Sequence, residues 1–383
     1  MDQNRISKRA IDIPPFLVVD VIDKMADLRS KGADVISLAV GEPDFDTPEV
    51  ICQAASKAMC SGATHYTHSL GIIELREAIC QDYQDRYGVS VDPDRIIVTP
   101  GTSPAMFLVF SGILEPGDEI ILSDPCYACY PNMIEYVGGV PSYVRVFEED
   151  AFQYRSEMIK EKLTDKTRAI LINSPSNPTG NLLESERMRK IADMGPLVIS
   201  DEIYHGLVYE GREHSILEFT DNAIVLNGFS KRYAMTGWRI GYCILPKEMV
   251  RPLQKVQQNF FISTGDFVQH AAVAALKHGG ADVERMRQTY DRRRKTLIQG
   301  VKDLGFGITV EPTGAFYVLA NAKKFTDDSL SFVMDILDNA HVGVAPGIDF
   351  GEGAEGYIRF SYATSEDRIE QGLERISEYL GNL

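Results

Sequence analysis

Short apolar runs recur through the middle of the chain, and their lengths and spacings predict buried β-strands. These runs cover residues 96–98, 119–122, 169–172, 197–199, 223–226 and 239–245. Segments of helical length separate most of them, and connections of that length join parallel strands in a sheet covered by helices on both faces. Before these runs, residues 48–60 and 71–87 have the apolar spacing of amphipathic helices. The pattern predicts an α/β fold.

The pattern changes near residue 288. A basic helix around residues 292–295 is followed by short strand-like runs at 315–319 and 357–361, with helices around them. These runs predict a second, smaller α+β domain built from both chain ends. We expect an N-terminal arm and part of this small domain at 1–45, a large cofactor-binding domain at 46–287 and the C-terminal small domain at 288–383. No internal repeat or low-complexity linker marks the boundaries.

Composition narrows the classes of function. The chain has 383 residues, 44% of them hydrophobic, and a formal net charge of -16. This acidity would repel nucleic acid and anionic membranes, and no apolar run approaches the roughly 18 residues of a membrane span. The start of the chain lacks the apolar region of a signal peptide, and the six cysteines are scattered. We therefore expect a cytoplasmic protein with reduced thiols.

Two short motifs carry little weight. Cys126 and Cys129 have the CxxC spacing of redox and zinc sites, but no second half-site accompanies them. Residues 351–356 match GxGxxG, yet they precede a strand-like run and hold two carboxylates where a pyrophosphate would lie. We interpret the first as a structural pair and the second as a loop, and expect no metal site.

Polar residues gather directly after the predicted strands, where open parallel sheets bind ligands. They are Gly101, Thr102 and Ser103 at a helix start near Pro104, the segments 173–180, 200–204 and 227–231, and Arg239. Taken singly, Asp201 suits a helix cap, 177–180 a turn and Lys231 a surface charge. Together they place an anion cradle, a carboxylate, a phenol, an amide and a lysine at neighbouring strand ends, which indicates an active site.

With these residues the chain resembles class I aminotransferases of pyridoxal-phosphate fold type I, in particular the bacterial-type aspartate aminotransferase subgroup. The motifs that carry the resemblance lie at residues 41–48, 65–66, 173–180, 200–204, 230–231, 235–242, 314–317 and 358–363. The resemblance covers nearly the whole chain. It implies an enzyme that binds pyridoxal 5'-phosphate and moves an amino group from an L-amino acid to a 2-oxo acid by a ping-pong mechanism.

The resemblance also implies roles for single residues. Lys231 would hold the cofactor covalently and move the substrate proton, with Asp201 beside the ring nitrogen. Asn177 and Tyr204 would bind the 3' oxygen, and Tyr127 would stack on the ring where relatives commonly have Trp. The residues expected at the phosphate are Gly101, Thr102, Ser103, Ser230, Arg239 and, from a neighbouring subunit, Tyr66. This last role implies a homodimer with shared active sites.

Arg359 matches the arginine that grips the substrate α-carboxylate, with Gly41 and Asn177 beside it. In the aspartate-specific relatives a lysine at the position of Ser103 helps to recognise the distal carboxylate, and here that cation is absent. Residues 13–16, which lie over the substrate side chain in the family, are apolar. We therefore expect a donor with a neutral or hydrophobic side chain, and 2-oxoglutarate as acceptor because the family usually uses it.

Three alternatives stay open at this level. Another cation could restore aspartate as the donor. The same fold also runs carbon–sulfur β-elimination, because the cofactor performs the bond-breaking and the pocket selects the bond. A non-catalytic cofactor-binding regulator is the third, although a pure binder has no need of Lys231, Asp201, Arg239 and Arg359 together.

Overall fold

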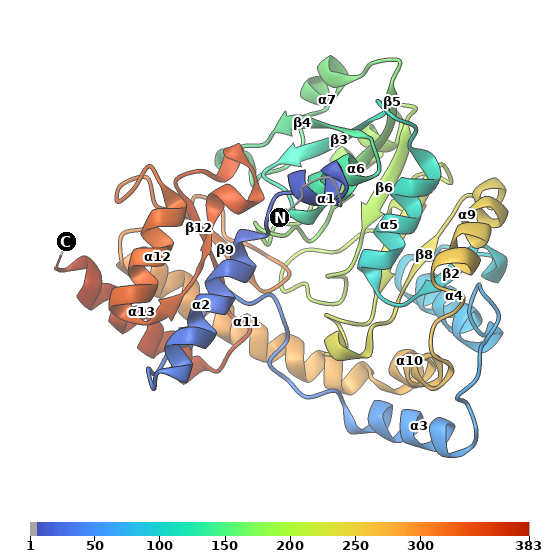
Figure 1. Cartoon of the computed structure of the whole chain (residues 1–383), viewed down its shortest axis with the longest axis horizontal. Helices are drawn as coiled ribbons and strands as arrows, with labels where there is room; N and C mark the ends of the chain where they lie inside the picture. The colour runs from blue at the N-terminus through green and yellow to red at the C-terminus, as the bar shows by residue number, and fades with distance from the viewer. Residues whose placement is uncertain (1–5, 383) are drawn as a thin grey trace.

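The structure is a computed structural model, and it describes residues 6–382 (Figure 1). Residues 1–5 of the predicted N-terminal arm and residue 383 at the end of the predicted C-terminal domain lie outside the described residues. None of the helices in the described part is long and apolar enough to cross a membrane.

A seven-stranded sheet occupies the middle of the chain, with strand order β2-β8-β7-β6-β5-β3-β4. Its strands are β2 (Ile96–Thr99), β3 (Glu119–Asp124), β4 (Val140–Arg145), β5 (Thr167–Asn173), β6 (Leu197–Asp201), β7 (Ala223–Gly228) and β8 (Gly241–Ile244). All neighbours pair in parallel except those that involve β8. No crossover helix separates β7 from β8, so β8 runs antiparallel to its neighbours.

Alternate residues of each strand enter two different cores, because successive side chains of a strand point to opposite faces. Ile97, Ile199 and Leu226 pack in the core that contains α5, α6 and α9, whereas Val98 and Val198 pack on the opposite face. Burial on both faces explains why the strands read as nearly continuous apolar runs. The sheet thus fixes the strand ends in a rigid frame.

Helices cover both faces and extend to a second, smaller sheet. Their bounds are α1 (Lys8–Asp12), α2 (Leu17–Ser30), α3 (Glu49–Cys60), α4 (Ile73–Tyr87), α5 (Thr102–Ile113), α6 (Cys129–Tyr136), α7 (Ser156–Lys162), α8 (Ser185–Ala192), α9 (Lys247–Phe260), α10 (Asp266–His278), α11 (Gly280–Asp303), α12 (Ser329–Ala340) and α13 (Glu366–Leu380). The long helix α11 passes from beneath the large sheet to the small one (Figure 1). It crosses the predicted boundary at residues 287 and 288 without a break.

The small sheet is antiparallel, with strand order β11-β12-β9, and packs with α11 and α12. Its strands are β9 (Tyr317–Asn321), β11 (Ala345–Pro346) and β12 (Tyr357–Ser361). Beside it, β1 (Ile36–Ser37) pairs in parallel with β10 (Val342–Gly343), and α2 contacts β10 and β11. Residues from the two chain ends therefore form one compact unit.

The predicted α/β fold with a mostly parallel sheet is confirmed. Three local features of the structure differ from the prediction. The edge strand β4 was not predicted, because Pro141 and half-exposed residues interrupt its apolar pattern. The helix expected near Pro104 begins two residues earlier, at Thr102. The run 239–245 is a strand only over Gly241–Ile244, since Arg239 adopts a left-handed turn with φ 53°.

Candidate active site

A cavity of about 340 Å³ lies at the carboxyl edge of the large sheet, where it meets α2 and the small sheet. Its wall contains eleven of the thirteen predicted site residues: Gly41, Thr102, Ser103, Tyr127, Asn177, Asp201, Tyr204, Ser230, Lys231, Arg239 and Arg359. The structure thus brings together residues that are up to 318 positions apart, counting from 41 to 359. The other two, Gly101 and Tyr66, lie outside the wall.

Asp201 is the last residue of β6, and its side chain is buried against the cavity. The Tyr130 hydroxyl donates a 2.6 Å hydrogen bond to its Oδ2, and the backbone N–H of Ile203 donates to its Oδ1 at 3.1 Å. Burial raises the pKa of Asp201 to about 6, against the lowering effect of these donors and of Lys231. The carboxylate is therefore poised to gain stability from a cationic partner in the cavity.

Lys231 follows β7 in a turn, and its Nζ donates a 2.6 Å hydrogen bond to the carbonyl of Gly41. Burial lowers its pKa to about 8, with Arg359 and Arg239 acting in the same direction and Glu42 opposing them. A lysine with such a pKa has a useful neutral fraction near pH 7, so its amine can act as a nucleophile or base. No described carboxylate forms an ion pair with it.

The N-terminus of α5 forms an anion cradle at one end of the cavity. Gly101 caps the helix with φ 107°, and a Cβ at this position would lie 2.6 Å from Nη2 of Arg239. Glycine adopts this positive φ without strain and leaves the guanidinium free to lie beside the helix start. Thr102, Ser103 and Ser230 add hydroxyl groups to the same wall. Free helical N–H groups, hydroxyls and an arginine are the donor set that suits a phosphate.

Arg359, a residue of β12, lies at the side of the cavity opposite the anion cradle. It is 2% exposed. Its Nη1 donates to Oδ1 of Asn177 at 2.8 Å, its Nη2 donates to the carbonyl of Ala39 at 2.7 Å, and its Nε has no partner among the described residues. The rings of Tyr317 and Phe350 lie 4.3 and 4.7 Å from its guanidinium carbon. A buried cation with an unpaired donor is suited to a carboxylate ligand.

Tyr204 lies between these two ends. Its hydroxyl is 2.8 Å from the hydroxyl of Tyr317, and burial raises its pKa well above the usual value. Arg359 opposes that shift. The cavity therefore holds an anion cradle, a lysine with a lowered pKa, a buried carboxylate, a phenol and an arginine clamp.

Comparison with known proteins identifies the family that has this set of site residues. The model of the family "Aminotransferase class I and II" matches residues 33–376. The chain belongs to this family. It is 43% identical over 379 residues to the (5-formylfuran-3-yl)methyl phosphate transaminase of Methanocaldococcus jannaschii, covering 98% of this chain and 99% of that protein. It is 38% identical to the aspartate/prephenate aminotransferase of Thermus thermophilus, with 98% of this chain and 99% of that one covered.

Solved structures agree. A crystal structure from Methanococcus jannaschii, described as similar in its active site to kynurenine aminotransferases, superposes with a TM-score of 0.91 at 43% identity, covering 98% of this chain and all of the other. A tetra mutant of the T. thermophilus aspartate aminotransferase complexed with tryptophan reaches a TM-score of 0.94 at 38% identity, with 97% and 99% covered. The chain is a pyridoxal-phosphate-dependent aminotransferase, as the resemblance implied.

The residues of this aminotransferase fit that cofactor. The anion cradle, kept open by the missing Cβ of Gly101, suits the phosphate, and the buried carboxylate of Asp201 suits a protonated ring nitrogen. Tyr127 lines the cavity and meets Tyr130 edge to face at 5.3 Å. The donors and acceptors thus match the chemistry of pyridoxal phosphate at both ends and on one face.

α2 forms a largely apolar wall of the cavity. Phe16, Val18, Val19 and Ile22 line it, and the Phe16 ring meets Tyr127 edge to face at 6.0 Å. Within residues 13–16, the segment expected over the substrate, only Phe16 reaches the cavity wall, while Ile13 is exposed. The apolar wall is therefore mostly the first two turns of α2 itself.

Sequence reasoning missed two aromatic residues of the site. Tyr130 hydrogen-bonds Asp201, and Tyr317 contacts both Tyr204 and Arg359. Tyr130 stands three residues after Tyr127, at the spacing of one helical turn, which was an available signal. Tyr317 belongs to a motif of the resemblance, but nothing in its neighbourhood in sequence indicated its partners.

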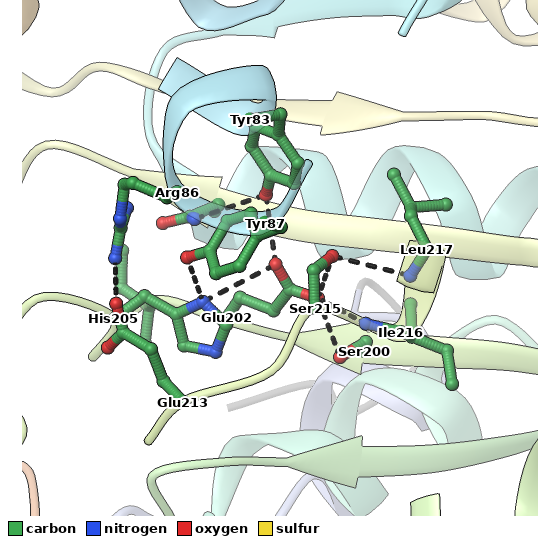
Figure 2. Close-up of polar contacts among 12 residues, drawn as sticks. Tyr83, Arg86, Tyr87, Ser200, Glu202, His205, Glu213, Ser215, Ile216 and Leu217 are labelled. Atoms are coloured by element: carbon green, nitrogen blue, oxygen red, sulfur yellow. Dashed lines mark hydrogen bonds and ion pairs between the residues drawn. The ribbon is translucent and has the colours of Figure 1, made fainter. Parts of the chain in front are cut away.

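A second polar network surrounds Glu202, the residue that follows the end of β6 (Figure 2). Glu202 is fully buried there and accepts hydrogen bonds from the hydroxyls of Ser200, Ser215 and Tyr83 and from the N–H of Ile216, at 2.9 to 3.2 Å. Burial raises the pKa of Glu202 to about 7. The network ties the β6 end to α4 and to the turn at Ile216–Glu218.

His205 completes this network. Its Nδ1 lies 2.7 Å from the Tyr87 hydroxyl and 3.6 Å from Oε2 of Glu202, and burial lowers its pKa to about 4. Glu213 pairs with Arg86 nearby (Figure 2). None of these side chains lines the cavity. The network supports the site from behind.

Proposed function

We propose that this aminotransferase moves the amino group of an L-amino acid with a neutral or hydrophobic side chain to a 2-oxo acid, with 2-oxoglutarate as the first candidate acceptor, by a ping-pong mechanism. One observation carries the donor class. The lysine and arginine residues of the cavity wall are Lys231, Arg239 and Arg359, and each has a task at the cofactor or at the α-carboxylate. No lysine or arginine of this wall remains for a distal carboxylate.

Pyridoxal phosphate supplies an aldehyde carbon that bonds amino groups and a ring that withdraws electrons from the bond to be broken. In the proposal, Lys231 would hold that carbon covalently and would move the proton at the substrate Cα. With a pKa of about 8, roughly a tenth of the lysine is neutral at pH 7. Asp201, which accepts the hydrogen bond from Tyr130, would keep a proton on the ring nitrogen.

The remaining contacts orient the cofactor and the substrate. Asn177 and Tyr204 would bind the 3' oxygen, and Tyr127 would cover the ring. The phosphate would be held by Gly101, Thr102, Ser103, Ser230 and Arg239. Arg359 would hold the substrate α-carboxylate, because the buried Nε of Arg359 is free to donate a hydrogen bond. The backbone of Gly41 would lie beside that carboxylate.

The wall near the substrate side chain supports the donor class in two ways. Ser103 stands where aspartate-specific relatives have a lysine, and α2 contributes three apolar side chains beside that of its N-cap residue, Phe16. Glu42 also lines the cavity, hydrogen-bonded to Thr236, and would repel a distal carboxylate. The solved M. jannaschii relative is described as similar in its active site to kynurenine aminotransferases, and kynurenine has an aromatic side chain.

We also propose a homodimer with shared active sites. Tyr66 is 81% exposed and outside the cavity of its own chain. Its neighbour Thr67 bonds Ser263 and contacts Thr264, next to Ile262 and Phe260, which are exposed as well. Exposed large apolar side chains at one place are typical of a surface that another chain covers. A second copy seated there would bring its Tyr66 to the neighbouring phosphate.

A half-reaction screen tests the donor class. Each amino acid is added to the holoenzyme, and the change in cofactor absorbance reports amino-group transfer without a guess about the acceptor. We expect alanine, leucine or phenylalanine to react faster than aspartate. A kcat/KM for aspartate far above all three would overturn the proposal. Full turnover is then compared with 2-oxoglutarate and pyruvate, and light scattering gives the mass of the assembly.

A further inference from the structure

One acidic side chain outside the cavity binds the start of the helix that forms part of the cavity wall. Oδ1 and Oδ2 of Asp349 accept hydrogen bonds from the backbone N–H groups of Leu17 and Val18, at 2.9 and 3.1 Å. These are the first two residues of α2, and its N-cap residue, Phe16, has no side-chain hydrogen bond to offer. A carboxylate 331 residues away thus supplies the cap that helices normally take from a neighbour in sequence.

The short turn that carries Asp349, Gly347–Phe350, touches two other parts of the site. The Phe350 ring lies 4.7 Å from the Arg359 guanidinium, and the Phe350 carbonyl accepts a 2.9 Å hydrogen bond from the N–H of Cys126. Cys126 directly precedes Tyr127. The turn therefore contacts the start of α2, the guanidinium of Arg359 and the loop that carries Tyr127.

A second cavity adjoins the start of α2. This cavity of about 260 Å³ lies between residues 14–17 and the turn, and it is lined by Pro14, Pro15 and Ile348 among others. Asp349 has no ion-pair partner among the described residues, and burial raises its pKa, with Arg359 and the two N–H groups opposing the shift. Val18 also packs with Phe350 in one buried apolar cluster, so the two hydrogen bonds add a directed polar connection to this apolar contact between α2 and the turn.

We propose that Asp349 is a positioning residue that seats the start of α2 over the substrate side chain and links that seating to the Arg359 clamp. The inference rests on the proposed function, because it requires a donor side chain that reaches α2. A large apolar donor contacts both α2 and Arg359, whereas alanine contacts only the clamp. Loss of the two hydrogen bonds should therefore weaken the selection of large donors and leave alanine nearly unchanged.

The test compares Asp349→Ala, Asp349→Asn and wild-type holoenzyme. For Asp349→Ala we expect KM for phenylalanine to rise about ten-fold, the scale of one lost cap, with kcat and the KM for alanine changed less than about three-fold. Asp349→Asn keeps one acceptor oxygen and should fall between the two. Amide hydrogen exchange at residues 17–20 should accelerate in the same order, a readout that does not depend on turnover.

Asp338→Ala is the matched control. Asp338 forms an ion pair at 2.6 Å with Lys24, which lies in α2 away from the cavity. Loss of Asp338 therefore removes an equal charge without freeing the start of α2. Equal losses for alanine and phenylalanine, release of the cofactor, or unchanged exchange at residues 17–20 in Asp349→Ala and Asp349→Asn would each overturn the inference. If wild-type enzyme prefers aspartate, the proposed donor class fails, and the exchange experiment still decides whether Asp349 holds α2.

Discussion

Two pairs of adjacent residues divide the strand ends into a reactive face and a supporting face. Asp201 and Lys231 point into the cavity, whereas their successors Glu202 and Arg232 point behind it. Arg232 pairs with Asp82 at 3.0 Å, and Glu202 is saturated by four hydrogen-bond donors. The cavity pair has fewer partners, and neither member forms an ion pair with a described residue.

This difference separates chemistry from support. A charge whose partners are all within the protein contributes to stability and is unavailable for reaction. A buried ionisable group with few partners in the protein can interact with a ligand or substrate. One step along the chain thus changes the task of a side chain. At Asp201 and Glu202 the extended chain at the end of β6 turns successive side chains to opposite sides, and at Lys231 and Arg232 the turn after β7 separates them.

The largest expected effect separates Lys231 from Arg232. Lys231→Ala removes the proposed nucleophile and base and should lower kcat by about 10⁴-fold or more, with unfolding free energy unchanged or raised because a buried unpaired charge is lost. Arg232→Ala should keep kcat within about ten-fold and lower stability by about 1 to 3 kcal/mol. Steady-state rates and urea unfolding measure both. Comparable rate losses in the two variants would contradict the division.

Asp201→Asn should lower kcat by about 10³-fold, since a charge pair near 4 Å is worth about 4 kcal/mol at an effective dielectric of 20. The amide cannot hold a proton on the ring nitrogen. Glu202→Gln, the neighbouring change of the same kind, should keep kcat within about ten-fold because Glu202 touches no reacting group. Rate losses of the same size in both variants would place the network of Figure 2 in the chemistry.

Glu202→Gln should also change how stability depends on pH. The folded pKa of Glu202 is raised from 4.5 to about 7, so the folded state holds its proton more tightly, and the stability this contributes is lost as pH rises from 4.5 to 7. The shift is worth about 3 kcal/mol at most. Urea unfolding of wild type and variant at pH 5 and pH 8 should show the wild-type advantage shrinking with pH.

His205 opposes this trend and serves as the internal check. Its folded pKa is lowered from 6.5 to about 4, so its contribution grows as pH rises from 4 to 6.5. Wild-type stability should therefore vary less with pH in this range than that of either single variant. A His205→Gln variant that depends on pH no more than wild type does would contradict the assignment.

The smallest effects concern one hydroxyl on each side. Tyr130→Phe removes the 2.6 Å hydrogen bond to Asp201 and should lower kcat by about ten-fold, the scale of a hydrogen bond to a charged group. Tyr83→Phe removes the 2.9 Å bond to Glu202 and should cost about 1 to 3 kcal/mol of stability with little change in rate. Equal losses of kcat in Tyr130→Phe and Tyr83→Phe would contradict the division into a reactive and a supporting face.

The central sheet and most of the cavity were predictable from sequence, because parallel strands end at one edge and polar residues follow each apolar run. Asp201, Asn177 and Lys231 are therefore found where the pattern placed them. The roles inferred for them by resemblance stay predictions, as do the domain boundaries. Contacts between distant segments gave no local signal: Asp349 caps α2 from 331 residues away, and Tyr317 meets Tyr204 across 113.

The pairing of β1 with β10 has a consequence for synthesis. Residues 36–37 leave the ribosome early, yet their partners at 342–343 are among the last to be made. The large sheet can assemble during translation, whereas the apolar wall of α2 must wait for the turn at Asp349. A nascent chain therefore completes its anion cradle well before it completes the pocket that selects the substrate.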